Sequence, residues 1–264
     1  SYSLPGVRDA EGYTFMGWST KPMQSVSPQY EAEEKITVNG NVDLYAVVFN
    51  RTTETDLTED QLPQVDIYKY KQVIFVGDSR TEFMENVLTG MGESATKNVK
   101  FVCSAGKGLD WFTTTGWAQL YSIVQHDSNS ILSKKTAVIF NFGVNDLSKS
   151  ADYAEYYNWI APQLKSKGCE LYFMSVNPVN RLMLPNAGRA DRSEAAVRSF
   201  NQYMKANLSS AYTYIDMYSY LKSTGYSFAS DHYGTGTVDD GLHYTTRTYK
   251  RIFAKCMDSL RVPA

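Results

Sequence analysis

Short apolar runs recur along the chain after about residue 65, and longer segments with a different pattern separate them. The runs occupy residues 73–76, 99–102, 137–140, 171–174 and 212–215. Continuous apolar runs of this length are typical of strands that are buried on both faces. We therefore predict a parallel sheet built from these five runs.

The segments between the runs carry apolar residues at helical spacing. Over residues 153–164, 197–208 and 249–260 they fall at positions i, i+3, i+4 and i+7, which gives each predicted helix one buried stripe. Strand and helix thus alternate, which indicates an α/β fold: a doubly wound, five-stranded parallel sheet in a flavodoxin-like three-layer sandwich. The tyrosines at 153, 156 and 157 fit either the core or a sugar-stacking surface, and their spacing favours the core.

The first 49 residues follow another pattern. Short β-prone pieces at 13–15, 35–38 and 43–49 are separated by Gly and Asn-Gly, the signature of hairpins. Residues 50–60 are polar and lack an apolar period, as in a solvated linker. We expect a small β-rich module over 1–49, a linker over 50–64 and the α/β domain over 65–264.

Composition and charge narrow the classes of function. The 264 residues include 43% hydrophobic residues, enough for a packed core, and 26 Lys and Arg stand against 28 Asp and Glu. Without a basic excess we expect neither nucleic acid nor a membrane surface as a partner. We also expect no membrane insertion, because no apolar run approaches the roughly 20 residues that span a bilayer. The three cysteines, Cys103, Cys169 and Cys256, are too scattered for a disulfide framework or a zinc site, and we expect them to be buried apolar residues.

The N-terminus carries no targeting signal. It begins Ser-Tyr-Ser, with neither an initiating Met nor a signal-type apolar stretch. We therefore expect a fragment cut from a longer protein, in which no signal peptide is present.

Polar residues able to do chemistry follow the predicted strands. Residues 77–80 read Gly-Asp-Ser-Arg, 104–108 Ser-Ala-Gly-Lys-Gly and 143–146 Gly-Val-Asn-Asp, and 240–243, before the last helix, read Asp-Gly-Leu-His. In an open α/β sheet, ligands bind beyond the carboxyl ends of the strands. These four blocks combine a hydroxyl, small backbone donors, an amide, a carboxylate and a histidine, which are the groups that acyl transfer requires.

In these blocks and their order, residues 65–264 resemble the SGNH hydrolases, also called GDSL esterases or lipases. The resemblance implies that Ser79 is the nucleophile, His243 the general base and Asp240 its orienting carboxylate. The implied oxyanion hole consists of the Ser79 backbone N–H, a glycine N–H of the second block and the Asn145 amide. No metal or organic cofactor is implied.

The chemistry of these residue types agrees with those roles. A serine hydroxyl becomes a useful nucleophile when an imidazole accepts its proton. With two residues between them, Asp240 and His243 fit one tight turn, in which the carboxylate fixes the histidine tautomer. Neighbouring Asp239 lacks this spacing, and we expect a solvated charge there. His126 and His232 are expected to be structural.

Three positions keep alternatives open. The glycine donor is either Gly106 or Gly108, and we prefer Gly108 because residues 109–111 then open the next helix. Arg80 stands where the name-giving motif has Leu, and it either meets an anionic or carbohydrate substrate, is solvated, or pairs with an acid. Asn177 follows the fourth strand and is expected to shape the acyl or sugar pocket.

The N-terminal module has its own resemblance. Residues 12–20 and 38–46 resemble the internalin-type B-repeat, or Listeria-Bacteroides repeat, of secreted and wall-attached bacterial proteins. This implies a secreted or surface-attached protein whose first module contacts a cell wall or glycan.

Three hypotheses of function follow. The first is a serine esterase that removes acyl groups, above all acetyl, from a carbohydrate or cell-wall glycan. The second keeps the same residues but passes the acyl group to a sugar hydroxyl, as a glycan O-acetyltransferase. The third is an adhesion or scaffold protein with an idle hydrolase domain, against which the intact Ser79, Asn145, Asp240 and His243 argue.

Overall fold

A computed structural model describes residues 1–23, 26–127, 134–229 and 238–260, and its chain forms two compact units. Unit 1 combines residues 1–56, 177–199 and 217–248, and unit 2 combines 57–176, 200–216 and 249–264. The boundaries expected near residues 49 and 65 stay a prediction, because each unit joins segments that are distant in the sequence.

Unit 2 contains the parallel sheet. Its strands are β5 (Tyr70–Gly77), β6 (Val99–Cys103), β7 (Lys135–Asn141), β8 (Cys169–Met174) and β9 (Tyr212–Ile215). They are all parallel, in the order β6-β5-β7-β8-β9. The chain therefore winds first to one side of β5 and then to the other, and the carboxyl ends of β5 and β7 mark the switch point where ligands bind. The predicted five-stranded, doubly wound sheet is confirmed.

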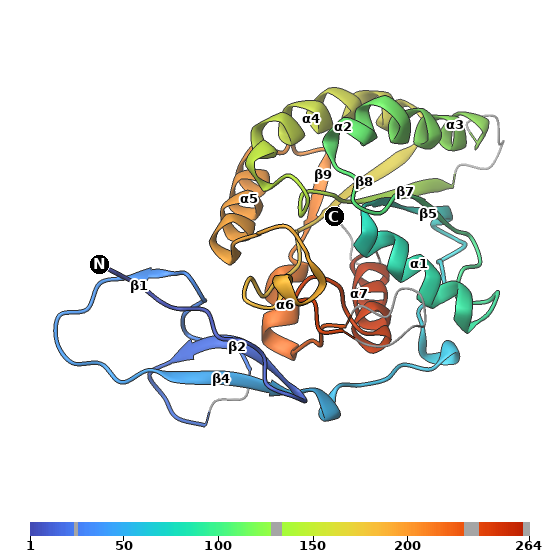
Figure 1. Ribbon diagram of the computed structural model, residues 1–264. Coiled ribbons are helices and arrows are strands. Elements are labelled where there is room, and N and C mark those ends of the chain that lie inside the picture. Colours follow the sequence, from blue (N-terminus) through green and yellow to red (C-terminus); the bar gives the residue numbers. More distant parts are fainter. Residues whose placement is uncertain (24–25, 128–133, 230–237, 261–264) are drawn as a thin grey trace. The chain divides into compact units, whose positions relative to one another are not determined.

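Helices cover both faces of this sheet (Figure 1). They are α1 (Ser79–Met91), α3 (Trp117–Asp127), α4 (Ser150–Ser166) and α7 (Thr246–Ser259), with short turns α2 (Leu109–Trp111), η2 (Glu59–Gln61), η3 (Phe112–Gly116) and η4 (Leu147–Lys149). On one face Phe253 of α7 packs against Phe75, with ring centroids 5.7 Å apart. On the other, Tyr157 of α4 packs against Phe140 at 4.8 Å. These aromatic contacts form the three-layer core.

The helical stripes read from the sequence are buried. Tyr153 and Tyr157 are 0% exposed, so their core assignment is confirmed, while Tyr156 is only half-buried. Cys169 and Cys256 are buried and Cys103 is half-buried. Helical periodicity thus identified the face of α4 that packs on the sheet.

The start of unit 1 is β-rich, as predicted, but its pairing differs. The strands are β1 (Tyr2–Ser3), β2 (Tyr13–Ser19), β3 (Lys35–Ile36) and β4 (Tyr45–Asn50). β1 pairs antiparallel with β3, and β2 with β4. The hairpin expected around Asn39-Gly40 is therefore wrong, because the pairing of β2 with β4 instead buries Phe15 and Val47. A local turn signal cannot reveal such a distant partner.

The remaining segments of unit 1 include a buried lysine. They hold η1 (Arg51–Thr53), η5 (Leu184–Ala187), the start of α5 (Glu194–Asn207) and α6 (Met217–Thr224). Lys222 of α6 has a 7% exposed side chain that lies 2.9 Å from a carboxylate oxygen of Glu31. Its ammonium also donates to the backbone oxygen of Met16 at 2.7 Å. The ammonium of α6 is thus satisfied by groups from the N-terminal 56 residues.

The polar stretch expected to be a solvated linker is partly buried. Glu54 is 5% exposed, and its carboxylate accepts hydrogen bonds from the hydroxyls of Ser227 and Thr248. Further along, Leu62 and Val65 are 3% and 6% exposed. A polar run is compatible with burial when each carboxylate finds donors, and those donors lie far away in the sequence.

Burial of Glu194 makes the stability of the protein depend on pH. Burial raises the pKa of Glu194 to about 7; the cations Lys222 and Arg198 oppose this, and Glu31 and Glu33 reinforce it. A carboxyl whose pKa is raised on folding contributes stability that is complete below the unfolded value of 4.5 and is lost as the pH rises through about 7.

We therefore expect Glu194→Gln to be increasingly more stable than the wild type as the pH rises. The difference in unfolding free energy should grow by about 3 kcal/mol between pH 5 and 8, as measured by urea unfolding. Glu11→Gln, at an exposed site, serves as the matched control. Parallel pH profiles for the wild type and Glu194→Gln would contradict the expectation.

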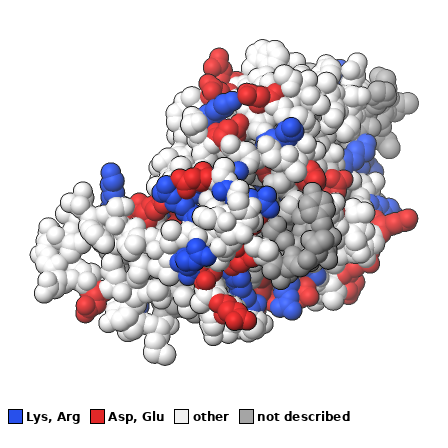
Figure 2. All heavy atoms as spheres, in the orientation of Figure 1, with Lys and Arg blue, Asp and Glu red and all other residues white. Residues whose placement is uncertain are grey.

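Charges on the surface are mixed in sign. On the face drawn in Figure 2, Lys and Arg side chains are interspersed with Asp and Glu. Among the helices described, none is both long enough and apolar enough to cross a bilayer.

Candidate active site

Ser79 is the first residue of α1 and directly follows the strand β5 and Asp78. Asp78 caps the helix: its buried carboxylate accepts the backbone N–H of Arg80 at 3.0 Å. Gly77 has no room for a side chain, because a Cβ there would lie 2.0 Å from the hydroxyl of Thr81. The sharp strand-to-helix turn thus holds Ser79 at a helix N-terminus, where the helix dipole favours negative charge.

The second and third blocks lie side by side in unit 2. The Asn145 amide donates to the backbone oxygen of Lys107 at 2.8 Å. Asp146 accepts the N–H of Leu109 at 2.9 Å, which fixes the start of α2. A Cβ on Gly108 would lie only 2.3 Å from an Asp146 oxygen. The backbone of Gly108 therefore lies against the segment that carries Asn145.

Gly106 differs from Gly108 in its surroundings. It has φ +70°, and a Cβ there would meet nothing within 4 Å. Its neighbour Ala105 donates its N–H to Glu82 of α1 at 2.6 Å, so the loop is tied to the helix that begins with Ser79. A Cβ on Gly108 would thus meet the Asn145 segment, whereas one on Gly106 would not, and which glycine is the donor stays a prediction.

Asp240 and His243 form a buried pair in unit 1. Nδ1 of His243 lies 2.6 Å from Oδ2 of Asp240, and the two residues are 2% and 0% exposed. The other carboxylate oxygen accepts the backbone N–H groups of Leu242 and His243, at 3.0 and 2.8 Å. Gly241, with φ +64°, provides the left-handed residue that this tight turn requires.

These hydrogen bonds stabilise the negative charge of Asp240. Burial alone would raise its pKa, but the hydrogen bond and charge of His243 and the two backbone N–H groups lower the pKa to about 2. The carboxylate is therefore ionised at neutral pH and accepts the Nδ1 proton. In that tautomer the basic nitrogen of a neutral imidazole is Nε2, as general-base catalysis requires.

Two charged neighbours of this pair are not evident from the sequence. Nε of Arg189 donates to Oδ2 of Asp240 at 3.1 Å, and nothing in the local pattern around residue 189 indicates this. Asp239, expected to be a solvated charge, instead lies 2.7 Å from Nη2 of Arg51 and has a 20% exposed side chain. That expectation was wrong because the partner is 188 positions away.

For the other candidate residues the structure gives burial at most. Arg80 is 3% exposed, which contradicts the solvated alternative for this residue, and Asn177 is 1% exposed. Their substrate-binding roles stay predictions. His126 belongs to α3, but its side chain lies outside the described part of the chain, as does the whole of His232.

Comparison with known families decides the assignment. The family model described as GDSL-like Lipase/Acylhydrolase matches residues 73–256, which is most of the chain. The chain belongs to the GDSL-like lipase/acylhydrolase family. This GDSL enzyme is therefore a hydrolase of the SGNH type, as the four blocks indicated. A second model, the Listeria-Bacteroides repeat domain, matches residues 1–47, which confirms the resemblance of the first module.

Several solved structures are similar to the GDSL hydrolase. A protein of Slackia heliotrinireducens described as an SGNH hydrolase is 13% identical, with 73% of this chain and 100% of that chain covered and a TM-score of 0.50. An acetyl xylan esterase is 12% identical, with coverages of 72% and 100% and a TM-score of 0.46. The catalytic domain of a peptidoglycan O-acetyltransferase of Streptococcus pneumoniae is 16% identical, with coverages of 72% and 92% and a TM-score of 0.41. No curated protein matches the chain.

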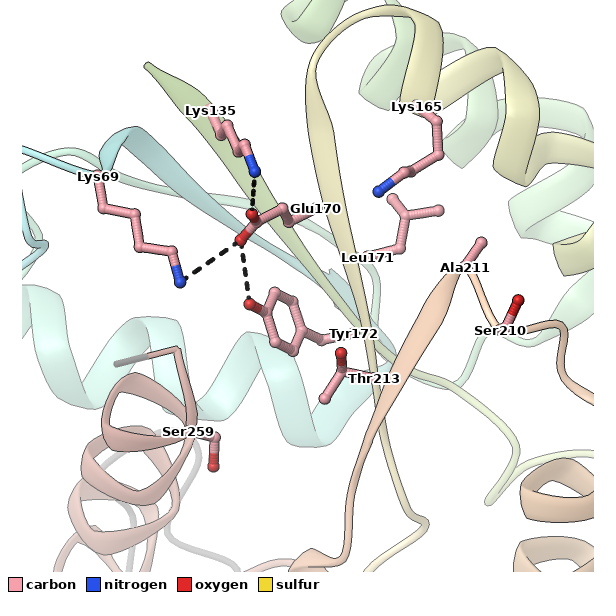
Figure 3. A pocket seen from close by; sticks show the side chains of 10 residues that line it. All are labelled: Lys69, Lys135, Lys165, Glu170, Leu171, Tyr172, Ser210, Ala211, Thr213 and Ser259. Atoms are coloured by element: carbon pink, nitrogen blue, oxygen red, sulfur yellow. Dashed lines mark hydrogen bonds and ion pairs between the residues drawn. The ribbon is translucent and has the colours of Figure 1, made fainter. Parts of the chain in front are cut away.

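The GDSL hydrolase also has a cavity of about 400 Å³ at the amino ends of its strands, the edge of the sheet opposite to Ser79 (Figure 3). Lys135 and Lys69 lie 2.6 and 3.7 Å from the Glu170 carboxylate. Partial burial opposes ionisation of Glu170, yet hydrogen bonds from Lys135 and Tyr70 lower its pKa to about 2. Both lysines thus share one carboxylate of the protein itself, and the lining contains no residue of the four blocks.

Within the ranges that the structure describes, no three His, Cys, Asp or Glu side chains are grouped so as to hold a metal ion.

Proposed function

We propose that this hydrolase is a serine esterase in which Ser79 is the nucleophile and His243 its general base, oriented by Asp240. The observation that carries the proposal is the buried hydrogen bond of 2.6 Å between Asp240 and His243. This bond fixes the His243 tautomer in which Nε2 can accept the proton of a serine hydroxyl. The position of Ser79 at the N-terminus of α1 and the family membership support the same assignment.

The reaction follows from these roles. Nε2 of His243 takes the hydroxyl proton as the oxygen of Ser79 attacks the ester carbonyl. The N–H groups of Ser79 and Gly108 and the amide of Asn145 stabilise the oxyanion. The imidazolium then protonates the leaving alcohol, and a water molecule, deprotonated by His243, releases the acid from the acyl-enzyme. This mechanism requires Ser79 and His243 to come within hydrogen-bond reach of each other.

For the substrate we propose an acetyl ester of a carbohydrate, most simply of a bacterial cell-wall glycan. The support is the match to the Listeria-Bacteroides repeat, which is typical of surface or secreted bacterial proteins. In this view the protein acts outside the cell. Aryl esters of increasing chain length and acetylated glycans, assayed side by side, test acyl length and sugar together.

A fluorophosphonate tests the nucleophile directly. The reagent should form one covalent adduct, on the peptide that contains Ser79, and abolish aryl acetate hydrolysis in proportion to labelling. Labelling of another serine with loss of activity would contradict the proposal. Product analysis with a glycan acceptor present distinguishes hydrolysis from acyl transfer. In hydrolysis the acyl group passes to water, and in transfer it passes to a sugar hydroxyl.

Asn145→Ala tests the oxyanion hole. Loss of one donor should lower kcat by about 10²- to 10³-fold and leave KM nearly unchanged, because the amide acts on the developing charge. Asn207→Ala is the matched control, since its amide also donates to a backbone oxygen, that of Tyr203 at 2.8 Å. Equal kcat values for Asn145→Ala and the wild type would exclude Asn145 from the oxyanion hole.

A further inference from the structure

The turn that carries Asp240 and His243 is bonded to the N-terminal segment, residues 1–56 of unit 1. Nη2 of Arg51 lies 2.7 Å from a carboxylate oxygen of Asp239 and 2.7 Å from one of Asp9. The same guanidinium donates through Nε to the Thr14 hydroxyl at 2.9 Å. The Asp9 carboxylate is 0% exposed and the Arg51 side chain 18% exposed. A largely buried arginine thus joins the N-terminal segment to the residue directly before Asp240.

A second connection reaches the residue directly after Asp240. The backbone N–H of Asn180 donates to the backbone oxygen of Gly241 at 2.8 Å. The Asn180 amide in turn donates to Val7 and Asp9, both at 2.9 Å. The packing is close, since a Cβ on Gly241 would lie 2.3 Å from the Asn180 oxygen. Asn180 therefore fixes Gly241 against the N-terminal segment.

A third connection holds the backbone of Asp239 itself. The Asn186 amide donates to the Asp239 backbone oxygen at 2.9 Å. The Asn186 side-chain oxygen accepts a hydrogen bond of 2.7 Å from Arg8. Residues 7–9 and 51 thus hold both neighbours of Asp240, while Asp240 itself holds His243.

We propose that the N-terminal segment is a structural part of the acid–base half of the active site, with Arg51 as a positioning residue for Asp240 and His243. This inference rests on the proposed function, because it assigns the pair its catalytic purpose. Arg51 touches none of the reacting groups; it acts through Asp239 on the turn that follows.

The physical cause is the pairing of charges. Arg51 bridges the carboxylates of Asp9 and Asp239, and without its guanidinium the turn loses this charged contact with the N-terminal segment. The turn from Asp239 to His243 is then free to move away from that segment. A displacement of about 1 Å in a catalytic group is enough to cost about 100-fold in rate.

Arg51→Met in the full chain tests the proposal, because Met keeps an apolar stem and removes the guanidinium. We expect kcat for an aryl acetate to fall about 10- to 100-fold, with KM within about twofold of the wild type. Fluorophosphonate labelling should slow in proportion, and Arg51→Lys should recover part of the loss, since it keeps the charge. The matched control is Arg181→Met, which removes an arginine that also joins two carboxylates, those of Glu33 and Asp191, neither of which belongs to the turn.

Spectroscopy separates this proposal from the proposed function. The low-field proton resonance of the His243 Nδ1–H should shift or broaden in Arg51→Met and persist in Arg181→Met, whether or not the protein hydrolyses esters. Absence of labelling at Ser79 in the wild type would instead reject the proposed function.

Two results would overturn the proposal. One is a folded Arg51→Met that keeps the kcat and the Nδ1–H resonance of the wild type. This result would overturn the proposal even if the variant had lost glycan binding. If Arg51→Met does not fold, Asp239→Asn decides, because it keeps the shape of the contact and removes one charge. We expect it to lower kcat several-fold, and an unchanged kcat and resonance would be the second overturning result.

Discussion

Replacing Ser79 by Ala is expected to lower kcat for aryl acetate hydrolysis by about 10³- to 10⁶-fold, with little change in KM. The substitution removes the oxygen that we propose attacks the ester, and it leaves the helix start, with its Asp78 cap, in place. The residual rate should come from the oxyanion donors and from substrate binding, which act without the nucleophile. Steady-state kinetics with p-nitrophenyl acetate measures both constants.

Ser104→Ala is the control for this substitution. Ser104 follows β6 at the same edge of the sheet, in the block that contains Gly108, and it is half-buried. It should retain full activity and full fluorophosphonate labelling. Undiminished turnover by Ser79→Ala, or equal losses in both variants, would reject Ser79 as the nucleophile.

Asp240→Asn should cause the second large loss, about 10²- to 10⁴-fold in kcat near neutral pH. An asparagine amide can present N–H to Nδ1 of His243, and the ring then places its proton on Nε2, where it cannot accept one from Ser79. The wild-type carboxylate avoids this, because its hydrogen bonds with His243 and the turn outweigh burial and lower its pKa to about 2.

The lowered pKa of Asp240 predicts how stability and kcat depend on pH. Since the Asp240 pKa is lowered on folding, its stabilising contribution is present above the unfolded value of 3.8 and disappears as the pH falls through about 2. Wild-type kcat should therefore show no change from Asp240 between pH 5 and 8. Asp43→Asn, the same change at an exposed site, should behave as the wild type. A kcat for Asp240→Asn within tenfold of the wild type would exclude Asp240 as the orienting group.

The sequence predicted the features that depend on local pattern. Strands such as β5 and β7 are continuous apolar runs because both faces of the sheet are covered, and the stripe containing Tyr153 and Tyr157 is buried. The turn between Asp240 and His243 was also predictable, because three positions of chain suffice to close its hydrogen bond. Each of these features is determined by residues close together in the chain.

Features that depend on distant partners could not be predicted in this way. The polar run around Glu54 looks solvated until Ser227 and Thr248 supply its donors. The contact of Arg51 with Asp239 spans 188 positions, and Arg189 reaches Asp240 across 51. A charge is easily read from a sequence, but its solvation is a property of the fold.

The ammonium of Lys222 has a consequence for how such a protein could arise. Its acceptors, the Met16 oxygen and the Glu31 carboxylate, come from the stretch that matches the Listeria-Bacteroides repeat, whereas residue 222 lies within the stretch that matches the hydrolase family. The Met16 acceptor is a backbone oxygen, which any repeat with the same fold would supply, whereas the Glu31 carboxylate depends on its side chain. A foreign repeat spliced in at residue 47 would therefore have to bring a carboxylate at the position of Glu31 to keep the ammonium at position 222 paired.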